Sequence, residues 1–251
     1  MRVNQFLILL NDPDAAYLAS MLAYTPLAFY DASVSNVWED SAATAPAGDD
    51  GDVVGRWDDL SGNGYHVSQA TAANKPLLKL NIQNGRRVIR ADGTDDFLQN
   101  TAFADVANNY TVFAVAKYNT SVDTSQGVFD VSTGAVNTGF AMLHDATTIW
   151  RGGSGAESVA GSDSRDGVWR LHTGHASGSQ LQYWVNGASV GTLAQSANTN
   201  VLNTITVFQL VATPSYVMLG DIAALVIFNS TLSDANRNAV EKLLNERWRV
   251  Y

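Results

Sequence analysis

The sequence predicts an all-β fold, a sandwich of two antiparallel sheets with one short helix near the C-terminus, and three observations support this. Short runs of β-branched and aromatic residues alternate with Gly, Ser, Thr, Asn and Asp along most of the chain. The pair Asn186-Gly187 separates two such runs, which is the strongest short-range hairpin signal. With 46% hydrophobic and 16% charged residues, the 251-residue chain can bury a large core as one unit.

The predicted strands are apolar runs that end at turn-forming residues: Val88–Ala91, Tyr110–Tyr118, Gly127–Val131, Trp169–His175, Leu181–Asn186, Ile205–Leu210 and Val217–Phe228. In the second run, Val112 and Ala114 alternate with Phe113 and Val115, so both faces of the strand are apolar. Strands buried on both faces favour a two-layer sandwich, in which two sheets pack face to face.

One helix is predicted near the C-terminus. Ser233 is a suitable N-cap, and Asp234 lies where the helix dipole favours an acidic side chain. Apolar residues then recur on one face, at Ala239, Val240, Leu243, Leu244 and Trp248. This face should pack against the sandwich.

Residues 1–24 differ from the rest of the chain. The apolar spacing from Ala15 to Ala23 predicts a short helix entered from Asp14. We therefore expect an N-terminal arm or anchor over residues 1–24, followed by one domain over residues 25–251. Within that domain, the small, polar and acidic stretch 39–52 should form a surface loop.

Several blocks, in order, resemble the laminin-G-like, concanavalin A-like lectin and glucanase superfamily, as found in phage and microbial surface proteins. They are Leu27–Ala32 (LAFYDA), Trp57–Gly64 (WDDLSGNG), Ile89–Leu98 (IRADGTDDFL), Leu181–Gly187 (LQYWVNG) and Gly220–Phe228 (GDIAALVIF). The resemblance implies a two-sheet antiparallel jelly-roll sandwich. It covers roughly Leu27 to Trp248, with Ala91 where the family usually has an aromatic residue, and the arm has no counterpart in it.

Glucanases of this superfamily carry a Glu-x-Asp-x-x-Glu arrangement, because hydrolysis needs an acid and a nucleophile at a fixed separation. The glutamates of this chain do not form this motif: Glu39, Glu157, Glu241 and Glu246. The pairs Asp58-Asp59 and Asp95-Asp96 lie in turns, where bonding to the local backbone explains them. We therefore expect a protein that is not an enzyme and has no catalytic residues.

Charge and composition exclude several partners. A net charge of −9 disfavours binding to nucleic acid or anionic lipid. The absence of cysteine excludes disulfides and thiolate chemistry. The apolar run Phe6–Leu10 is too short for a signal peptide, and no stretch is long enough for insertion into a membrane.

No cofactor is required by the sequence; if an ion is bound, calcium is the one expected, since Asp49, Asp50 and Asp52 place several carboxylates in one loop. The alternative is a solvated acidic loop without an ion. His172 and His175 suggest a metal site only weakly, because residues three apart on a strand point to opposite faces.

Glycan contact is predicted at Trp150, Arg151 and Tyr65, because sugars stack on aromatic rings while flanking polar groups bind their hydroxyls. These residues lie near predicted loops, although packing within the protein is an open alternative for each. Three other tryptophans, Trp57, Trp169 and Trp248, fall in core positions and are predicted to be structural.

The function expected from these observations is a non-enzymatic structural or adhesion protein of a virus particle, such as a phage capsid-decoration or tail-associated protein. A fold typical of extracellular proteins, without an export signal, would suit assembly in the host cytoplasm and release within virions. The arm would bind other virion proteins, the domain could contact host surface glycans, and a homo-oligomer is compatible with this role. The alternative is a stand-alone carbohydrate-binding module at a cell surface, with a glycoside hydrolase or lyase less favoured.

Overall fold

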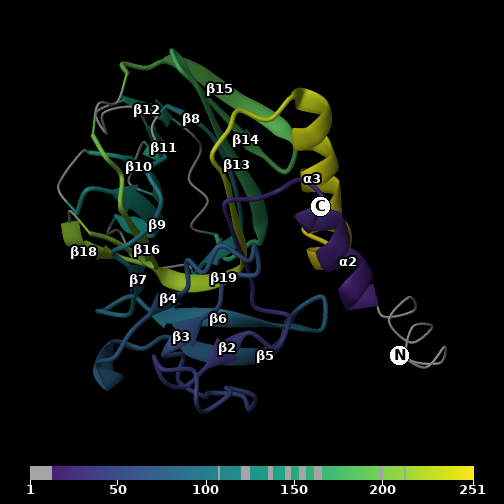
Figure 1. Ribbon diagram of the computed structural model, residues 1–251, viewed down its shortest axis with the longest axis vertical. Coiled ribbons are helices and arrows are strands. Elements are labelled where there is room, and N and C mark those ends of the chain that lie inside the picture. Colours follow the sequence, from purple (N-terminus) through teal and green to yellow (C-terminus); the bar gives the residue numbers. More distant parts are fainter. Residues whose placement is uncertain are drawn as a thin grey trace.

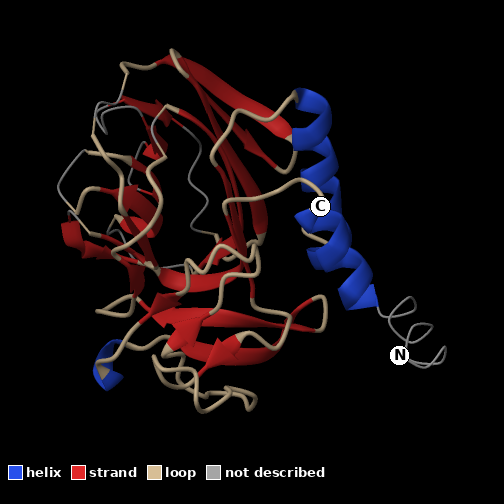
Figure 2. Cartoon of the chain, viewed as in Figure 1, coloured by secondary structure: helices blue, strands red, loops and turns tan. Residues whose placement is uncertain are grey.

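A computed structural model describes residues 13–106, 108–119, 125–134, 138–144, 148–152, 157–160, 166–197, 200–211 and 213–251. For residues 144, 148–152, 157, 158, 160 and 213–215 it describes the backbone alone. Within these ranges no helix is long and apolar enough to cross a membrane. Two β-sheets face each other, and two helices lie on one flank (Figures 1 and 2).

The eight-stranded sheet consists, in spatial order, of β15 (Ala188–Ala194), β14 (Gln180–Val185), β13 (Arg170–Ser177), β8 (Asn109–Tyr118), β19 (Leu219–Phe228), β6 (Arg86–Asp92) and β5 (Leu77–Gln83). Its eighth strand, β1 (Ala28–Asp31), pairs with the C-terminal half of β19, while β6 pairs with the N-terminal half. All of these strand pairs are antiparallel.

The eleven-stranded sheet consists, in spatial order, of β12 (Glu157–Ala160), β11 (Thr148–Gly152), β10 (Phe140–His144), β9 (Gln126–Ser132), β16 (Thr204–Val207), β7 (Leu98–Asn100), β4 (Val67–Ser68), β3 (Arg56–Trp57) and β2 (Val37–Trp38). The hairpin of β17 (Gln209–Leu210) and β18 (Thr213–Val217) joins it through a parallel pairing of β18 with β9. A short 3-10 helix, η1 (Ala72–Asn74), precedes β5.

The helices α2 (Pro13–Leu22) and α3 (Asp234–Trp248) form a third layer on the outer face of the eight-stranded sheet (Figure 1). In β19, Leu225 and Ile227 belong to the core between the sheets. Their neighbours Val226 and Phe228 belong to a second core, beneath the helices. From Gly220 onward, every residue of the strand is buried.

This third layer corrects one detail of the prediction. The expected two-sheet sandwich is present, but two layers do not explain strands that are apolar on both faces. Phe113 and Val115 of β8 pack in the second core with Tyr17 and Met21 of α2. The apolar outer face therefore indicates a helical cover, because an outer sheet face in contact with water would alternate with polar residues.

The structure contains the predicted helix cap, the predicted hairpin turn and the predicted N-terminal helix at the expected residues. The Ser233 side chain accepts a hydrogen bond from the backbone nitrogen of Asn236 and caps α3. Asn186 and Gly187 have φ of 52° and 74°, as the tight turn between β14 and β15 requires. The helix expected over 15–23 is α2. The strands that were not among the predicted runs are β2, β3, β4, β5, β7, β10, β11, β12 and β18.

A polar network centred on Arg247 of α3 joins the two helices to β1. Its guanidinium contacts the carboxylate of Asp14 in α2 and the hydroxyl of Ser33, and it lies 4.6 Å from the centre of the Tyr17 ring. The Tyr17 hydroxyl donates to Asp31, which is fully buried. Burial raises the pKa of Asp31, and the Arg247 contact lowers the pKa of Asp14. The described part of the predicted arm, residues 13–24, therefore packs against the domain.

Candidate functional site

A row of partly exposed side chains crosses four neighbouring strands on the outer face of the eleven-stranded sheet. Trp38 of β2 pairs with Arg56 of β3, Arg56 with Ser68 of β4, and Ser68 with Gln99 of β7. We call these four residues the Trp38 row. Since neighbouring strands lie about 4.8 Å apart, the row spans roughly 14 Å.

Strand alternation keeps this row on the solvent side. The residues next to it in sequence are buried in the core between the sheets: Val37, Trp57, Val67 and Leu98. Because successive side chains of a strand point to opposite faces, the core anchors the strands and turns the row outward. All four members of the row are only partly buried.

Asp58 fixes the orientation of the indole and the guanidinium at one end of the row. Its Oδ2 accepts a hydrogen bond of 2.7 Å from Trp38 Nε1, and its Oδ1 accepts one of 2.6 Å from Arg56 Nε. His66 Nδ1 lies 2.9 Å from Asp58 Oδ1 and 3.1 Å from the amide nitrogen of Asp59, so it donates to the first or accepts from the second according to its tautomer.

The outward ends of these side chains are available to a ligand. Among the described residues, none bonds to Nη1 or Nη2 of Arg56 or to the Ser68 hydroxyl. Gln99 Nε2 donates to Thr206 Oγ1 at 3.0 Å, which leaves the amide oxygen free. The row therefore combines one aromatic ring with oriented donors and acceptors, as recognition of a polyhydroxylated molecule requires.

The predicted glycan contacts lie elsewhere. Tyr65 packs against the core, and its ring meets that of Phe103 edge-on, with centroids 4.9 Å apart. Trp150 and Arg151 lie in β11, where their backbones pair with Met142 and Ala141, and their side chains are outside the described part. Four strands separate β11 from β4, next to Tyr65, so the structure does not bring the three residues together.

The register nevertheless connects Arg151 to the Trp38 row. From Gln99, consecutive cross-strand partners are Thr206, Asp130, Ala141 and Arg151. The sequence did not indicate Trp38 or Arg56 as contacts. Their strands contain two residues each, too few for an alternating pattern to be recognised.

Two of the three tryptophans expected to be structural are in the core. Trp57 packs between the sheets and Trp248 beneath the helices, both with no exposed surface. Trp169 is partly buried against the second core, with the Lys117 ammonium 5.6 Å from its ring centre.

The acidic loop predicted to bind calcium has other partners for its carboxylates. Asp50 accepts from Lys79 Nζ at 2.5 Å and from the amide of Leu80 at 2.8 Å. Asp52 Oδ2 accepts from the amides of Gly48 and Asp49 and closes its own turn. These contacts lower the pKa of Asp50 and of Asp52, and they count against a calcium site at Asp49, Asp50 and Asp52, which stays a prediction.

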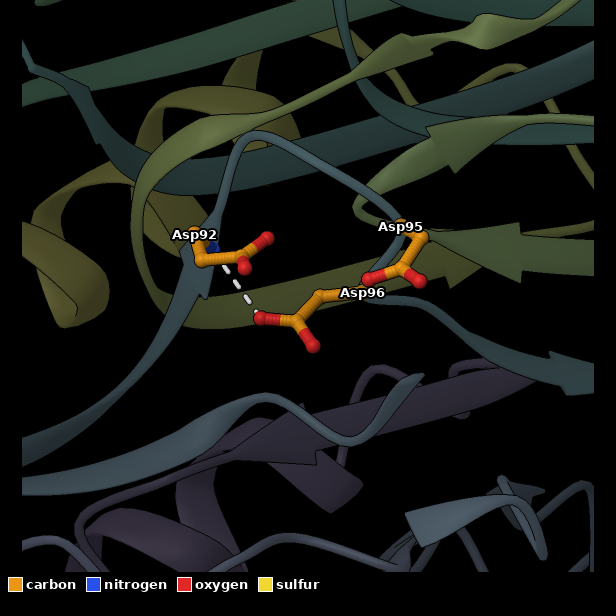
Figure 3. A group of neighbouring side chains, drawn as sticks. All are labelled: Asp92, Asp95 and Asp96. Atoms are coloured by element: carbon orange, nitrogen blue, oxygen red, sulfur yellow. Dashed lines mark hydrogen bonds between the residues drawn. The ribbon is translucent and has the colours of Figure 1, made fainter. Parts of the chain in front are cut away.

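The described acids do converge at a different turn. Carboxylate oxygens of Asp92, Asp95 and Asp96 lie within 4.8 Å of one another (Figure 3). Asp96 is 4% exposed, and its Oδ2 accepts a 2.9 Å hydrogen bond from the amide of Asp92. Burial, with a contribution from the charges of Asp92 and Asp95, raises the pKa of Asp96 to about 6. This turn is closed by its own backbone bonds, as the sequence predicted.

The two histidines of β13 do not converge. His172 contacts the hydroxyl of Tyr183, in the core between the sheets. His175 lies 5.8 Å from the ring of Trp184, which Arg237 of α3 also contacts. Burial and the Arg237 charge lower the pKa of His175.

Comparison with known proteins identifies the fold and no family. No family model and no curated protein match the chain. Among solved structures it is similar to the binding domain of botulinum neurotoxin serotype C1, with a TM-score of 0.60 and 14% identity over 88% of this chain and 53% of that one. It is also similar to the binding domain of botulinum neurotoxin serotype D, with a TM-score of 0.58 and 13% identity over 90% of this chain and 52% of that one.

The binding domain of Paraclostridial Mosquitocidal Protein 1 gives a TM-score of 0.57 and 14% identity over 76% of this chain and 49% of that one. This chain thus spans about half the length of the structures it matches. At this identity the likeness concerns the fold alone. The chain has a jelly-roll-like β-sandwich that it shares with binding domains of toxins.

Proposed function

We propose that this protein is a non-enzymatic carbohydrate-binding domain and that the Trp38 row is its glycan-binding surface. The observation that carries the proposal is the Arg56 guanidinium beside the indole of Trp38: Asp58 orients it, and no described residue bonds to its two Nη groups. An indole offers an apolar face to a sugar ring, and a guanidinium offers two parallel donors to neighbouring hydroxyls. The shared fold supports the proposal, because the similar structures are described as binding domains.

The charge of the chain limits the class of glycan that this surface would bind. The net charge is −9, and Asp58 balances the charge of Arg56. A neutral oligosaccharide is therefore favoured over an anionic one, which the field of the whole protein would repel.

The experiment is a glycan array read with labelled wild-type protein and a Trp38→Ala variant. We expect saturable binding to neutral glycans that the substitution reduces at least tenfold, as the loss of one stacking contact of about 1.4 kcal/mol would. A matched control is Trp169→Ala, another partly buried tryptophan outside the row. An array without signals, or equal loss in both variants, would contradict the proposal.

We also propose that the chain is a member of the laminin-G-like, concanavalin A-like superfamily, because the sequence blocks named above resemble those of that superfamily. The expected place in a virus particle, with residues 1–24 bound to other virion proteins, remains a separate prediction. Mass spectrometry of purified particles from the source culture tests it: the protein should be present in intact particles, and its absence would contradict a virion role.

A further inference from the structure

A cavity lies beside the loop that connects β3 and β4. It has a volume of about 520 Å³, and three connections that are distant in sequence line it: the segment from α2 to β1, the loop from β3 to β4, and the segment from β19 to α3. This volume falls within the roughly 300–1,000 Å³ of pockets that hold small molecules. Among the described residues, its lining contains no charged side chain.

Thr25, in this lining, has a backbone conformation that its residue type disfavours. Its φ is 55°, in the left-handed region, where it ends α2 with its amide 2.9 Å from the carbonyl oxygen of Leu22. Glycine is the usual residue at such a helix end, and a β-branched residue there is a clear outlier. A threonine in this position indicates a use for its side chain, since glycine would form the same turn without strain.

The cavity contains several hydrogen-bonding groups that the protein itself does not use. In the described part of the chain, the hydroxyls of Thr25 and Ser230 have no partner. Asn63 Nδ2 donates to the Leu27 carbonyl at 2.9 Å and Asn229 Nδ2 donates to the Asp105 carbonyl at 3.3 Å, which holds both amides and leaves their oxygens free.

We infer that this cavity is a second binding site and that its ligand is a single neutral sugar residue. Two hydroxyls and two amide oxygens can donate to and accept from sugar hydroxyls. Leu22, with 37% of its surface exposed, offers an apolar wall for the C–H face of the ring. The described part of the lining offers no cation to pair with a carboxylate or a phosphate. The inference does not depend on the Trp38 row.

The test is an NMR titration of the full chain with methyl glycosides of glucose, galactose, mannose and N-acetylglucosamine. We expect saturable shifts of the Asn63 and Asn229 side-chain amide signals with at least one of these probes. Thr25→Gly should weaken that binding about tenfold, as the loss of one hydrogen bond does, while raising Tm because the strain is relieved. Ser230→Ala should weaken it similarly.

Two controls separate this site from the rest of the protein. Ser35→Ala removes an exposed hydroxyl that likewise has no partner among the described residues, and it should leave the shifts unchanged. Trp38→Ala should reduce array binding at least tenfold but leave the shifts unchanged, so a failure of the Trp38 row remains distinguishable. The inference is overturned if none of the four probes shifts the amide signals, or if Thr25→Gly raises Tm and binds the probe as the wild type does.

Discussion

Asp96→Asn should stabilise the protein at neutral pH and leave it unchanged in mild acid. In the folded state the pKa of Asp96 is raised from 3.8 to about 6, mainly by burial, so the folded protein holds a proton that the unfolded chain releases. The stability that this proton contributes is fully present below pH 3.8 and is lost as the pH rises through 6. At pH 7 the carboxylate is charged, although the side chain is 4% exposed.

The magnitude follows from the same values. A pKa difference of this size corresponds to at most about 3 kcal/mol, and we expect 1–2 kcal/mol because solvent screens part of the repulsion from Asp92 and Asp95. The asparagine oxygen can still accept the hydrogen bond from the Asp92 amide, so the turn stays closed. In a chain of this size, each kcal/mol changes Tm by roughly 2–4 °C.

The assay is urea unfolding of wild type and Asp96→Asn, followed by tryptophan fluorescence at pH 4 and pH 7.5. The two curves should nearly coincide at pH 4, and the variant should be more stable at pH 7.5. Destabilisation at pH 7.5 would refute this reasoning, because the turn would then need the charged carboxylate. A second result would also refute it: if added CaCl₂ stabilised the wild type but not the variant, Asp92, Asp95 and Asp96 would bind a cation.

Three further substitutions test the packing. Arg247→Leu leaves Asp31 buried without its cation and should lower the free energy of unfolding by about 3 kcal/mol, which thermal unfolding would show as a lower Tm. An unchanged Tm would mean that the network does not hold α2 in place. Ser233→Ala removes the cap of α3 and should cost about 1 kcal/mol in urea unfolding, unless another group caps the helix. Gly220→Ala places a methyl group 2.3 Å from the Lys117 carbonyl oxygen and should cost at least about 2 kcal/mol, and wild-type stability would contradict this packing.

The sequence predicted those parts of the fold that local chemistry determines. Ser233 begins α3 because a serine side chain can accept from the free amides of a helix end. Asn186 and Gly187 form the hairpin because both tolerate positive φ. The helical cover of the eight-stranded sheet depends on contacts between distant elements. The apolar face of the C-terminal helix and the apolar outer face of β8 indicated it, but not which sheet the helices cover.

Most residues of the candidate site could not be predicted from the sequence, and the reason is physical. The Trp38 row exists because four strands of only two or three residues each align in register across the sheet. Short strands carry no periodicity, and register is set by tertiary packing. A search for aromatic residues near loops therefore selected Tyr65, whose ring packs on Phe103, and overlooked Trp38.

The most direct test of the proposed function is the affinity of Arg56→Gln for the neutral oligosaccharide that binds best on the array, measured by calorimetry. Glutamine keeps a polar side chain but loses the two oriented donors, so we expect Kd to rise by about ten- to a hundredfold, for a loss of roughly 1.5–3 kcal/mol. Arg170→Gln removes a surface arginine paired with Asp166 and should leave Kd unchanged. Equal affinity of Arg56→Gln and wild type would contradict the Trp38 row as the glycan-binding surface.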